Sequence, residues 1–322
     1  MALQILNTME KQEKPVYIMH TFQLKPDYEG EVVATLIERK AEDPSKKALL
    51  YLHGFNDYFF QDHFAEWANG QGLNFYALEL RKYGRSILPH QKPNDFRNIR
   101  EYFEEIDQAV DFIREKGKNK KLVMVGHSTG GLIAALYAHD HRNDNRVDAL
   151  ILNSPFFEFN VPVVLKKTFL PLMITLAGTF PGLPSPVGLD TGYGYSLHKS
   201  HYGEWDYNLK LKPDAGFRIH AGWIKGVYKA QRELQQGLDI QCPVLVMYSA
   251  RSVKPGNYRP EMQHADAVLN VKDIERFSHV IGKNVERVAF EGGLHDLLLS
   301  EKPVREKVLQ KMEEFLKEKK II

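Results

Sequence analysis

The chain has 322 residues, of which 43% are hydrophobic and 26% are charged, and its formal net charge is +2. These proportions are typical of an ordinary globular protein, and the near balance of charge argues against a nucleic-acid partner. The length suffices for one large α/β domain with an insertion, or for two ordinary domains. The single cysteine, Cys242, excludes an intrachain disulfide and offers little support for a thiol mechanism.

Two apolar stretches bear on location. The first fifteen residues carry too short an apolar run for a secretory signal, so we expect a cytoplasmic protein. Residues 161–183 are strongly apolar, but Lys166, Lys167 and several prolines interrupt them. These interruptions argue against a continuous membrane-spanning helix, and we predict a lid over an apolar pocket instead.

The elements predicted in chain order begin with a hairpin. Residues 17–24 and 31–38 alternate in strand fashion around a turn at residues 26–30. Buried strands are then predicted at residues 48–53, 74–79, 122–125, 149–153, 244–248 and 285–290. Helical periodicity covers residues 99–113, 132–137 and 304–316. This alternation predicts an α/β fold, with a mostly parallel sheet flanked by helices on both faces.

The alternation of strands and helices stops between residues 154 and 238. This segment is rich in proline, glycine and aromatic residues. A structureless loop of that length would be unusual inside a compact domain. We therefore predict that residues 154–238 form a cap inserted between two core strands, and that residues 1–153 and 239–322 form the core.

The most informative stretch is residues 121–132, KLVMVGHSTGGL. An apolar strand sequence changes abruptly to Gly126-His127-Ser128-Thr129-Gly130 and then to a helical sequence. A serine in such a turn has a strained backbone, which the flanking glycines tolerate because they have no Cβ. The turn brings the hydroxyl to a helix N-terminus, where backbone N–H groups can meet an oxyanion. The pattern predicts that Ser128 is a nucleophile.

A serine nucleophile needs a base, and the base needs a carboxylate to orient it. His295 follows the last predicted strand and a pair of glycines, and loops at the carboxyl ends of parallel strands meet at one edge of a sheet. We predict that His295 is the base. No acid follows the strand at 244–248 directly. We favour the more distant Asp266 as the orienting acid, with Glu158 as the alternative.

Two backbone N–H groups are expected to form the oxyanion hole. One belongs to Thr129, which follows the nucleophile. The other belongs to Phe55 in His53-Gly54-Phe55, at the end of an earlier strand, where the glycine permits close approach of the backbone.

The order Ser128, Asp266, His295, with His53-Gly54-Phe55 upstream, resembles the α/β-hydrolase superfamily. The chain is most similar to the branch of monoglyceride lipases, lysophospholipases and serine aminopeptidase-like proteins. The resemblance covers nearly the whole chain and includes residues 80–86, LRKYGRS, which look like the Arg-Gly-x-Gly-x-Ser turn of that branch.

Two features depart from the pattern of the branch. Lys82 stands where a glycine is usual, and residues 251–263 read as an insertion between the strand and the acid. The insertion bears on the choice of the acid and leaves the nucleophile unaffected.

The pattern favours a serine hydrolase that cleaves a carboxylic ester through an acyl-enzyme. We expect a small-molecule acyl ester such as a monoacylglycerol or lysophospholipid, transient contact with lipid aggregates, and no metal or organic cofactor. An amide or peptide hydrolase on the same triad is an alternative, with Glu204 and Asp206 as candidate anchors for a free amino terminus. A non-catalytic ligand receptor of the same fold is the third reading, although the chain retains a residue for every triad position.

Overall fold

The computed structural model describes residues 16–42 and 46–322. The N-terminal segment on which the expected location rests, residues 1–15, lies outside these described residues. Among the helices that the structure describes, none combines the length and the apolar character needed to cross a bilayer.

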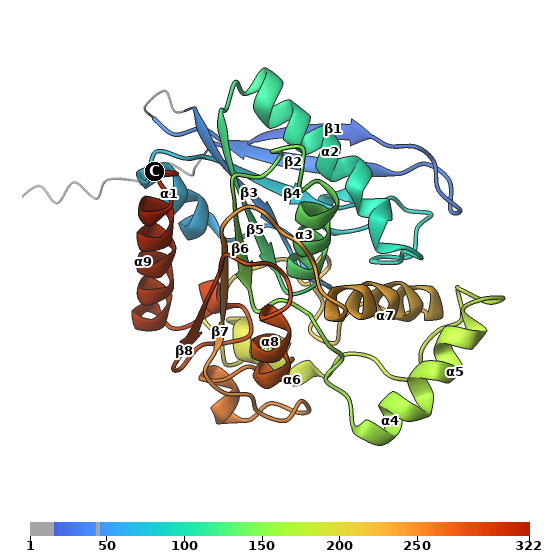
Figure 1. Ribbon diagram of the computed structural model, residues 1–322. Coiled ribbons are helices and arrows are strands. Elements are labelled where there is room, and N and C mark those ends of the chain that lie inside the picture. The colour runs from blue at the N-terminus through green and yellow to red at the C-terminus, as the bar shows by residue number, and fades with distance from the viewer. Residues whose placement is uncertain (1–15, 43–45) are drawn as a thin grey trace, which may run out of the picture.

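The described strands form one eight-stranded sheet in the order β1-β2-β4-β3-β5-β6-β7-β8 (Figure 1). Their bounds are β1 Ile18–Gln23, β2 Val33–Arg39, β3 Lys47–Leu52, β4 Asn74–Glu79, β5 Lys121–His127, β6 Ala149–Asn153, β7 Val244–Ser249 and β8 Val285–Phe290. The β1–β2 and β2–β4 pairs are antiparallel, and the other pairs are parallel. The predicted mostly parallel sheet and N-terminal antiparallel hairpin are therefore confirmed.

Helices cover both faces of the sheet (Figure 1). Their bounds are α1 Asp62–Gly70, α2 Phe103–Asp111, α3 Thr129–Asp140, α4 Val163–Lys167, α5 Phe169–Leu176, α6 Thr191–Leu197, α7 Ala221–Gln235, α8 Val271–Ser278 and α9 Lys302–Glu318. Buried residues of α1 and α9 pack in the core on one face, and those of α2, α3, α7 and α8 pack in the core on the other.

The central strands are apolar along their whole length because both of their faces are buried. In β3, Leu50 and Leu52 enter the core beneath α3, whereas Leu49 and Tyr51 enter the core beneath α9. Each of these four side chains is at most 1% exposed. Burial on two faces explains why the sequence shows continuous apolar runs instead of strict alternation.

The segment between β6 and β7 lies across the carboxyl ends of the parallel strands. It carries α4 and α5, which stand away from the sheet, then α6, which lies near the end of β7, and it ends with α7 (Figure 1). Helix α7 also contributes Trp223, Ile224 and Val227 to the core that contains α3. The segment is therefore anchored in the main core at its final helix.

Candidate active site

Ser128 joins β5 to α3 through a strained turn. Its backbone has φ 51° and ψ −116°, in a region that residues with a Cβ seldom occupy. The neighbouring glycines make the turn feasible, because a Cβ on Gly126 would lie 2.5 Å from the carbonyl oxygen of Gly130. A Cβ on Gly130 would collide with the carbonyl oxygen of His53. The Gly-x-Ser-x-Gly spacing thus allows a serine at this sharp strand-to-helix junction.

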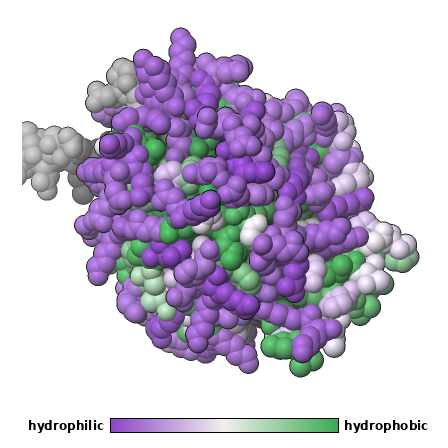
Figure 2. Space-filling model, viewed as in Figure 1, coloured by the Kyte–Doolittle hydropathy of each residue, from purple (hydrophilic) through white to green (hydrophobic). Residues whose placement is uncertain are grey.

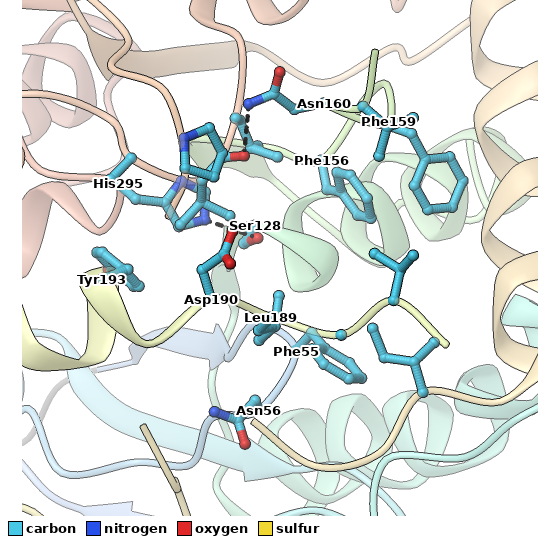
Figure 3. A pocket seen from close by; sticks show the side chains of 18 of the residues that line it. Phe55, Asn56, Ser128, Phe156, Phe159, Asn160, Leu189, Asp190, Tyr193 and His295 are labelled. Atoms are coloured by element: carbon cyan, nitrogen blue, oxygen red, sulfur yellow. Dashed lines mark hydrogen bonds between the residues drawn. The ribbon is translucent and has the colours of Figure 1, made fainter. Parts of the chain in front are cut away.

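Three residues from three loops form a continuous hydrogen-bonded line. The Nε2 atom of His295 lies 3.0 Å from Ser128 Oγ, and its Nδ1 atom lies 2.9 Å from Asp266 Oδ2. Figure 3 shows the imidazole of His295 pointing at Ser128. The exposed fractions are 8% for Ser128, 2% for His295 and 0% for Asp266, so bulk water competes little for these hydrogen bonds.

The partner of each nitrogen determines the tautomer of His295. A carboxylate can only accept, so the Nδ1–H of His295 donates to Asp266, and Nε2 is left to accept from the hydroxyl of Ser128. The second carboxylate oxygen of Asp266 accepts from the backbone N–H groups of Val268 and Leu269, at 2.8 and 2.7 Å. The carboxylate is therefore held at both oxygens, and the imidazole can take a proton from the serine.

The insertion after β7 explains why the acid lies so far along the chain. The chain leaves β7, and Asp266 returns beside the strand end through hydrogen bonds with Arg251 and Val253, at 3.0 and 2.9 Å. The intervening loop reaches the segment between β6 and β7. There the carbonyl oxygen of Gly256 accepts from the backbone N–H of Gly192, and the ring of Tyr258 stacks on that of Tyr202 at 3.8 Å. The insertion therefore changes the position of the acid in the sequence without moving it from the end of β7.

Glu158, the alternative acid, lies elsewhere. Its carboxylate is 3.6 Å from the ammonium of Lys166, and it accepts from the backbone N–H of Phe159 at 2.8 Å. The structure thus brings Asp266, and not Glu158, to His295.

Phe55 and Thr129 are the residues predicted to supply the oxyanion donors. Both residues line the same cavity as Ser128. Within the described part of the chain, neither backbone N–H donates to a protein acceptor. A Cβ on Gly54 would lie 3.1 Å from Ser128 Cβ, so the loop after β3 approaches the nucleophile closely. Both N–H groups are therefore available to an oxyanion beside Ser128.

His53 supports this loop. Its ring makes two hydrogen bonds: Nε2 accepts from the backbone N–H of Leu80 at 3.1 Å, and Nδ1 lies 2.9 Å from the carbonyl oxygen of Gly54. Burial lowers the pKa of the His53 imidazole to about 4. A neutral ring with its proton on Nδ1 satisfies both contacts. The His-Gly dipeptide is thus a structural support for the loop that carries Phe55.

Ser128 opens onto a cavity of about 780 Å³. The rings of Phe55, Phe156 and Phe159 lie to one side of the serine (Figure 3). Further apolar lining comes from the segment between β6 and β7, through Val163, Leu165, Phe169, Leu170, Ile219, Trp223 and Ile224. A cavity of this size and lining suits a ligand with a substantial apolar part.

The described residues include one group of side chains with the composition of a metal site. Asp57, His127 and Asp296 each offer one ligand atom, and these three atoms lie within 4.8 Å of one another. All three residues are buried. However, the ammonium of Lys212 lies 2.6 Å from Asp57 Oδ1 and already supplies a positive charge there. The cluster therefore fits a cation poorly.

The acids proposed as anchors for a free amino terminus point elsewhere. Glu204 pairs with Arg305 at 3.0 Å, and Asp206 pairs with Lys199 at 2.6 Å. Neither acid lines the cavity, whereas Asp190 does.

The family described as serine aminopeptidase, S33, matches residues 43–303. The chain belongs to this family. Among curated proteins, this S33 member is 26% identical over 265 residues to a 1-acylglycerol-3-phosphate O-acyltransferase of Rattus norvegicus, covering 71% of the chain and 70% of the relative. It is 25% identical over 251 residues to a monoglyceride lipase homolog of Monkeypox virus, covering 75% of the chain and 85% of the relative.

Solved structures share the fold of this S33 member. A soluble variant of monoglyceride lipase from Saccharomyces cerevisiae, in complex with a substrate analog, superposes with a TM-score of 0.65 at 17% identity. That match covers 94% of this chain and 97% of the yeast one. The monoacylglycerol lipase of Paleococcus ferrophilus gives 0.63 at 18% identity, covering 88% and 99%. The protein is thus an α/β-hydrolase of the monoglyceride lipase-like branch, and the predicted resemblance is confirmed.

Three polar residues beside the site were not predicted from the sequence. Asn56 and Asp57 directly follow Phe55, and Lys212 lies between α6 and α7, 155 positions beyond Asp57. The only local signal was a pair of polar residues between the apolar Phe55 and Tyr58. Their partners could not be inferred, because nothing in the sequence pairs this loop with a particular part of the segment between β6 and β7.

Proposed function

We propose that this α/β-hydrolase is a serine esterase that cleaves a small-molecule acyl ester through an acyl-enzyme. The observation that carries the proposal is the hydrogen-bonded line from Ser128 through His295 to Asp266, buried and open to an apolar cavity. The three roles assigned to these residues are nucleophile, base and orienting acid.

In the first half of the reaction, Ser128 Oγ attacks the ester carbonyl carbon while His295 Nε2 takes the hydroxyl proton. Asp266 stabilises the imidazolium that forms. The N–H groups of Phe55 and Thr129 donate to the tetrahedral oxyanion, where charge develops. The imidazolium then gives its proton to the leaving alcohol, and the acyl group remains on Ser128. Water repeats the sequence and releases the acid.

The cavity supports an acyl chain as the buried part of the substrate. Its lining is mostly apolar, and much of it comes from residues 154–238, which we propose as the cap subdomain over the core formed by the rest of the chain. One relative of the chain is named a monoglyceride lipase homolog. We therefore propose a monoacylglycerol, lysophospholipid or similar acyl ester as the substrate. None of the steps above requires a metal or an organic cofactor.

The outer surface of the cap supports transient contact with lipid aggregates. Val163, Val164, Leu172 and Phe180 are 65%, 69%, 56% and 60% exposed. In the space-filling view, apolar side chains gather where α4 and α5 lie (Figures 1 and 2). Residues 161–189 contain lysines but no acid, so anionic lipid would not be repelled. Val163 also lines the cavity, which links the exposed apolar surface to the site.

An aminopeptidase-like activity on the same triad is the second candidate. The exposed carboxylate of Asp190 lines the cavity near Ser128 and forms no ion pair within the described residues (Figure 3). A free amino terminus is a group that would pair with this carboxylate.

A substrate panel tests these proposals. Wild type and Ser128→Ala are assayed on p-nitrophenyl esters, monoacylglycerols, lysophospholipids and aminoacyl amides, after titration of active sites with a fluorophosphonate probe. We expect labelling of Ser128 and turnover of acyl esters. Faster turnover of aminoacyl amides would favour the second candidate. If Ser128 is not labelled and no substrate is turned over, the result would favour a non-catalytic ligand receptor of the same fold.

A further inference from the structure

The loop that carries Phe55 is bonded to one short segment of the cap. Asp57, two residues after Phe55, pairs with Lys212, with 2.6 Å between Oδ1 and Nζ. The side chains are 1% and 8% exposed, so the ion pair is almost fully removed from water. This pair joins the end of β3 to the middle of the cap.

Asn56 makes a second connection to the same segment. Its Nδ2 donates to the carbonyl oxygen of Pro213 at 2.8 Å, and its Oδ1 accepts from the backbone N–H of Phe217 at 3.3 Å. Asn56 has φ 52°, a left-handed conformation that asparagine tolerates better than most residues. In a third contact, the backbone N–H of Asn208 donates to the hydroxyl of Tyr58 at 2.7 Å. Tyr58, the residue after Asp57, therefore also contacts this part of the cap.

Fold stability alone gives little reason for the buried ion pair. Removing two charges from water is costly, and apolar side chains of similar volume often stabilise a fold as well or better. Buried ion pairs are, however, geometrically specific. Burial by itself would raise the pKa of the Asp57 carboxyl, yet Lys212 and His127 hold it well below its usual range. The pair is therefore charged, and it constrains the loop and the cap to one arrangement.

Phe55 stands between two fixed points. Before it, Gly54 is held by the ring of His53; after it, Asn56 and Asp57 are held by the cap. The side chain of Phe55 also packs on Trp223 of α7, with 4.7 Å between ring centroids. The direction of its backbone N–H thus depends on contacts with the cap as well as on the sheet.

We propose that Asn56, Asp57 and Lys212 form a latch through which the cap positions the oxyanion donor of Phe55. The proposal rests on the proposed serine esterase function. Asp57 and Lys212 are positioning residues: they act through the loop and need no contact with the reacting atoms. The oxyanion site is complete only when residues 207–217 of the cap are docked on the loop.

Breaking the latch tests this proposal. Lys212→Met and Asp57→Asn should each lower kcat by about 10²-fold, because losing one oxyanion donor costs about 10²–10³ in kcat. KM should stay within about threefold, since the apolar side chains that line the cavity are unchanged, although Lys212 itself also lines it. The double variant should lose about as much as either single variant, because the latch is already broken in each. Lys212→Arg should retain most of the activity.

Lys210→Met is the matched control. Lys210 lies two residues from Lys212 in the same segment, is exposed and forms no ion pair within the described residues. This variant should keep the wild-type kcat. All rates are expressed per active site titrated with fluorophosphonate, so that a misfolded fraction does not count as a slower enzyme.

An inhibitor gives a readout that a purely structural role would not change. Ser128 adds to the carbonyl carbon of an acyl trifluoromethyl ketone, and the adduct carries an oxyanion. The affinity of the ketone should therefore fall in Lys212→Met by about the same factor as kcat/KM. Binding of the corresponding trifluoromethyl alcohol, which cannot add to Ser128 and carries no oxyanion, should be unchanged. If titrated Lys212→Met enzyme keeps its kcat and its affinity for the ketone, the latch proposal is wrong.

Asn56→Gly tests the latch without changing a charge, in case the charge variants fold poorly. Glycine accepts the left-handed backbone but removes both side-chain bonds to the cap. We expect kcat to fall about tenfold or more, with weaker binding of the ketone. Unchanged kinetics would overturn the proposal. A wild type that neither hydrolyses esters nor reacts with fluorophosphonate would instead refute the esterase function, which separates the two failures.

Discussion

The ammonium of Lys82 lies 2.7 Å from the carboxylate of Asp27, although Lys82 occupies a position where the branch pattern has a glycine. The same ammonium lies 2.8 Å from Glu29, and the Lys82 side chain is fully buried. Its backbone has φ 64°, a conformation that suits glycine and costs a lysine about 1–2 kcal/mol. The turn between β1 and β2 is thus bonded to the loop after β4 by a residue that accepts backbone strain.

Lys82→Met should destabilise the protein by about 3–5 kcal/mol, because it leaves the largely buried Asp27 without its cation and Glu29 with only the ammonium of Lys92, 3.9 Å away. Urea unfolding at neutral pH measures this loss. Lys40→Met is the control, since Lys40 is 65% exposed and lies 3.8 Å from Glu38. It should cost less than about 1 kcal/mol. Equal losses in the two variants would show that the buried pairs contribute nothing specific.

Ser128→Ala should reduce ester turnover by about six orders of magnitude, while thermal stability is preserved. Labelling by a fluorophosphonate probe should disappear in the same variant. Activity above roughly one per cent in a clean preparation, with no other serine labelled, would contradict the assignment of the nucleophile.

Asp266→Asn and Glu158→Gln compare the two candidate acids. Asp266→Asn should lose roughly two to three orders of magnitude in kcat, because the amide no longer selects the required imidazole tautomer. Glu158→Gln should stay within about tenfold, since its carboxylate faces Lys166 and not His295. An exchange of these phenotypes would assign the orienting role to Glu158.

The acyl pocket can be tested on two faces of one helix. Leu170 of α5 lines the cavity and is 4% exposed, whereas Leu172 of the same helix is 56% exposed. Leu170→Trp should fill part of the cavity and shift the preferred p-nitrophenyl ester to a shorter acyl chain. Leu172→Trp should leave the chain-length profile unchanged on dissolved esters. Identical profiles in the two variants would show that the acyl chain binds elsewhere.

His63 should make stability dependent on pH. Burial, followed by the nearby Arg305, lowers the pKa of its imidazole from 6.5 to about 4. The unfolded chain therefore binds the proton more readily below pH 6.5, and stability is lost as the pH falls toward 4. Between about pH 7.5 and about pH 5, wild type should lose roughly 1–2 kcal/mol more unfolding free energy than His63→Gln. Parallel pH profiles from urea unfolding would contradict this expectation.

The sequence by itself determined the parts of the protein that depend on local chemistry. Apolar runs bounded by turns indicated the parallel strands, since burial on two faces requires apolar residues at every position. The glycines around Ser128 indicated a strained turn, because only residues without a Cβ fit beside it. The position of His295 beside Ser128 was predictable because the carboxyl ends of parallel strands share one edge of the sheet.

Tertiary structure alone decided the long-range pairs. The sequence left Asp266 and Glu158 as rival acids, because a 13-residue insertion, residues 251–263, hides how the chain returns to the end of β7. Nor could it pair Lys82 with Asp27, or Lys212 with Asp57. Hydrophobic periodicity reports which face of an element is buried. It carries no information on which charged side chains meet when the elements pack, and the two pairs here are more than fifty and more than a hundred and fifty positions apart in the sequence.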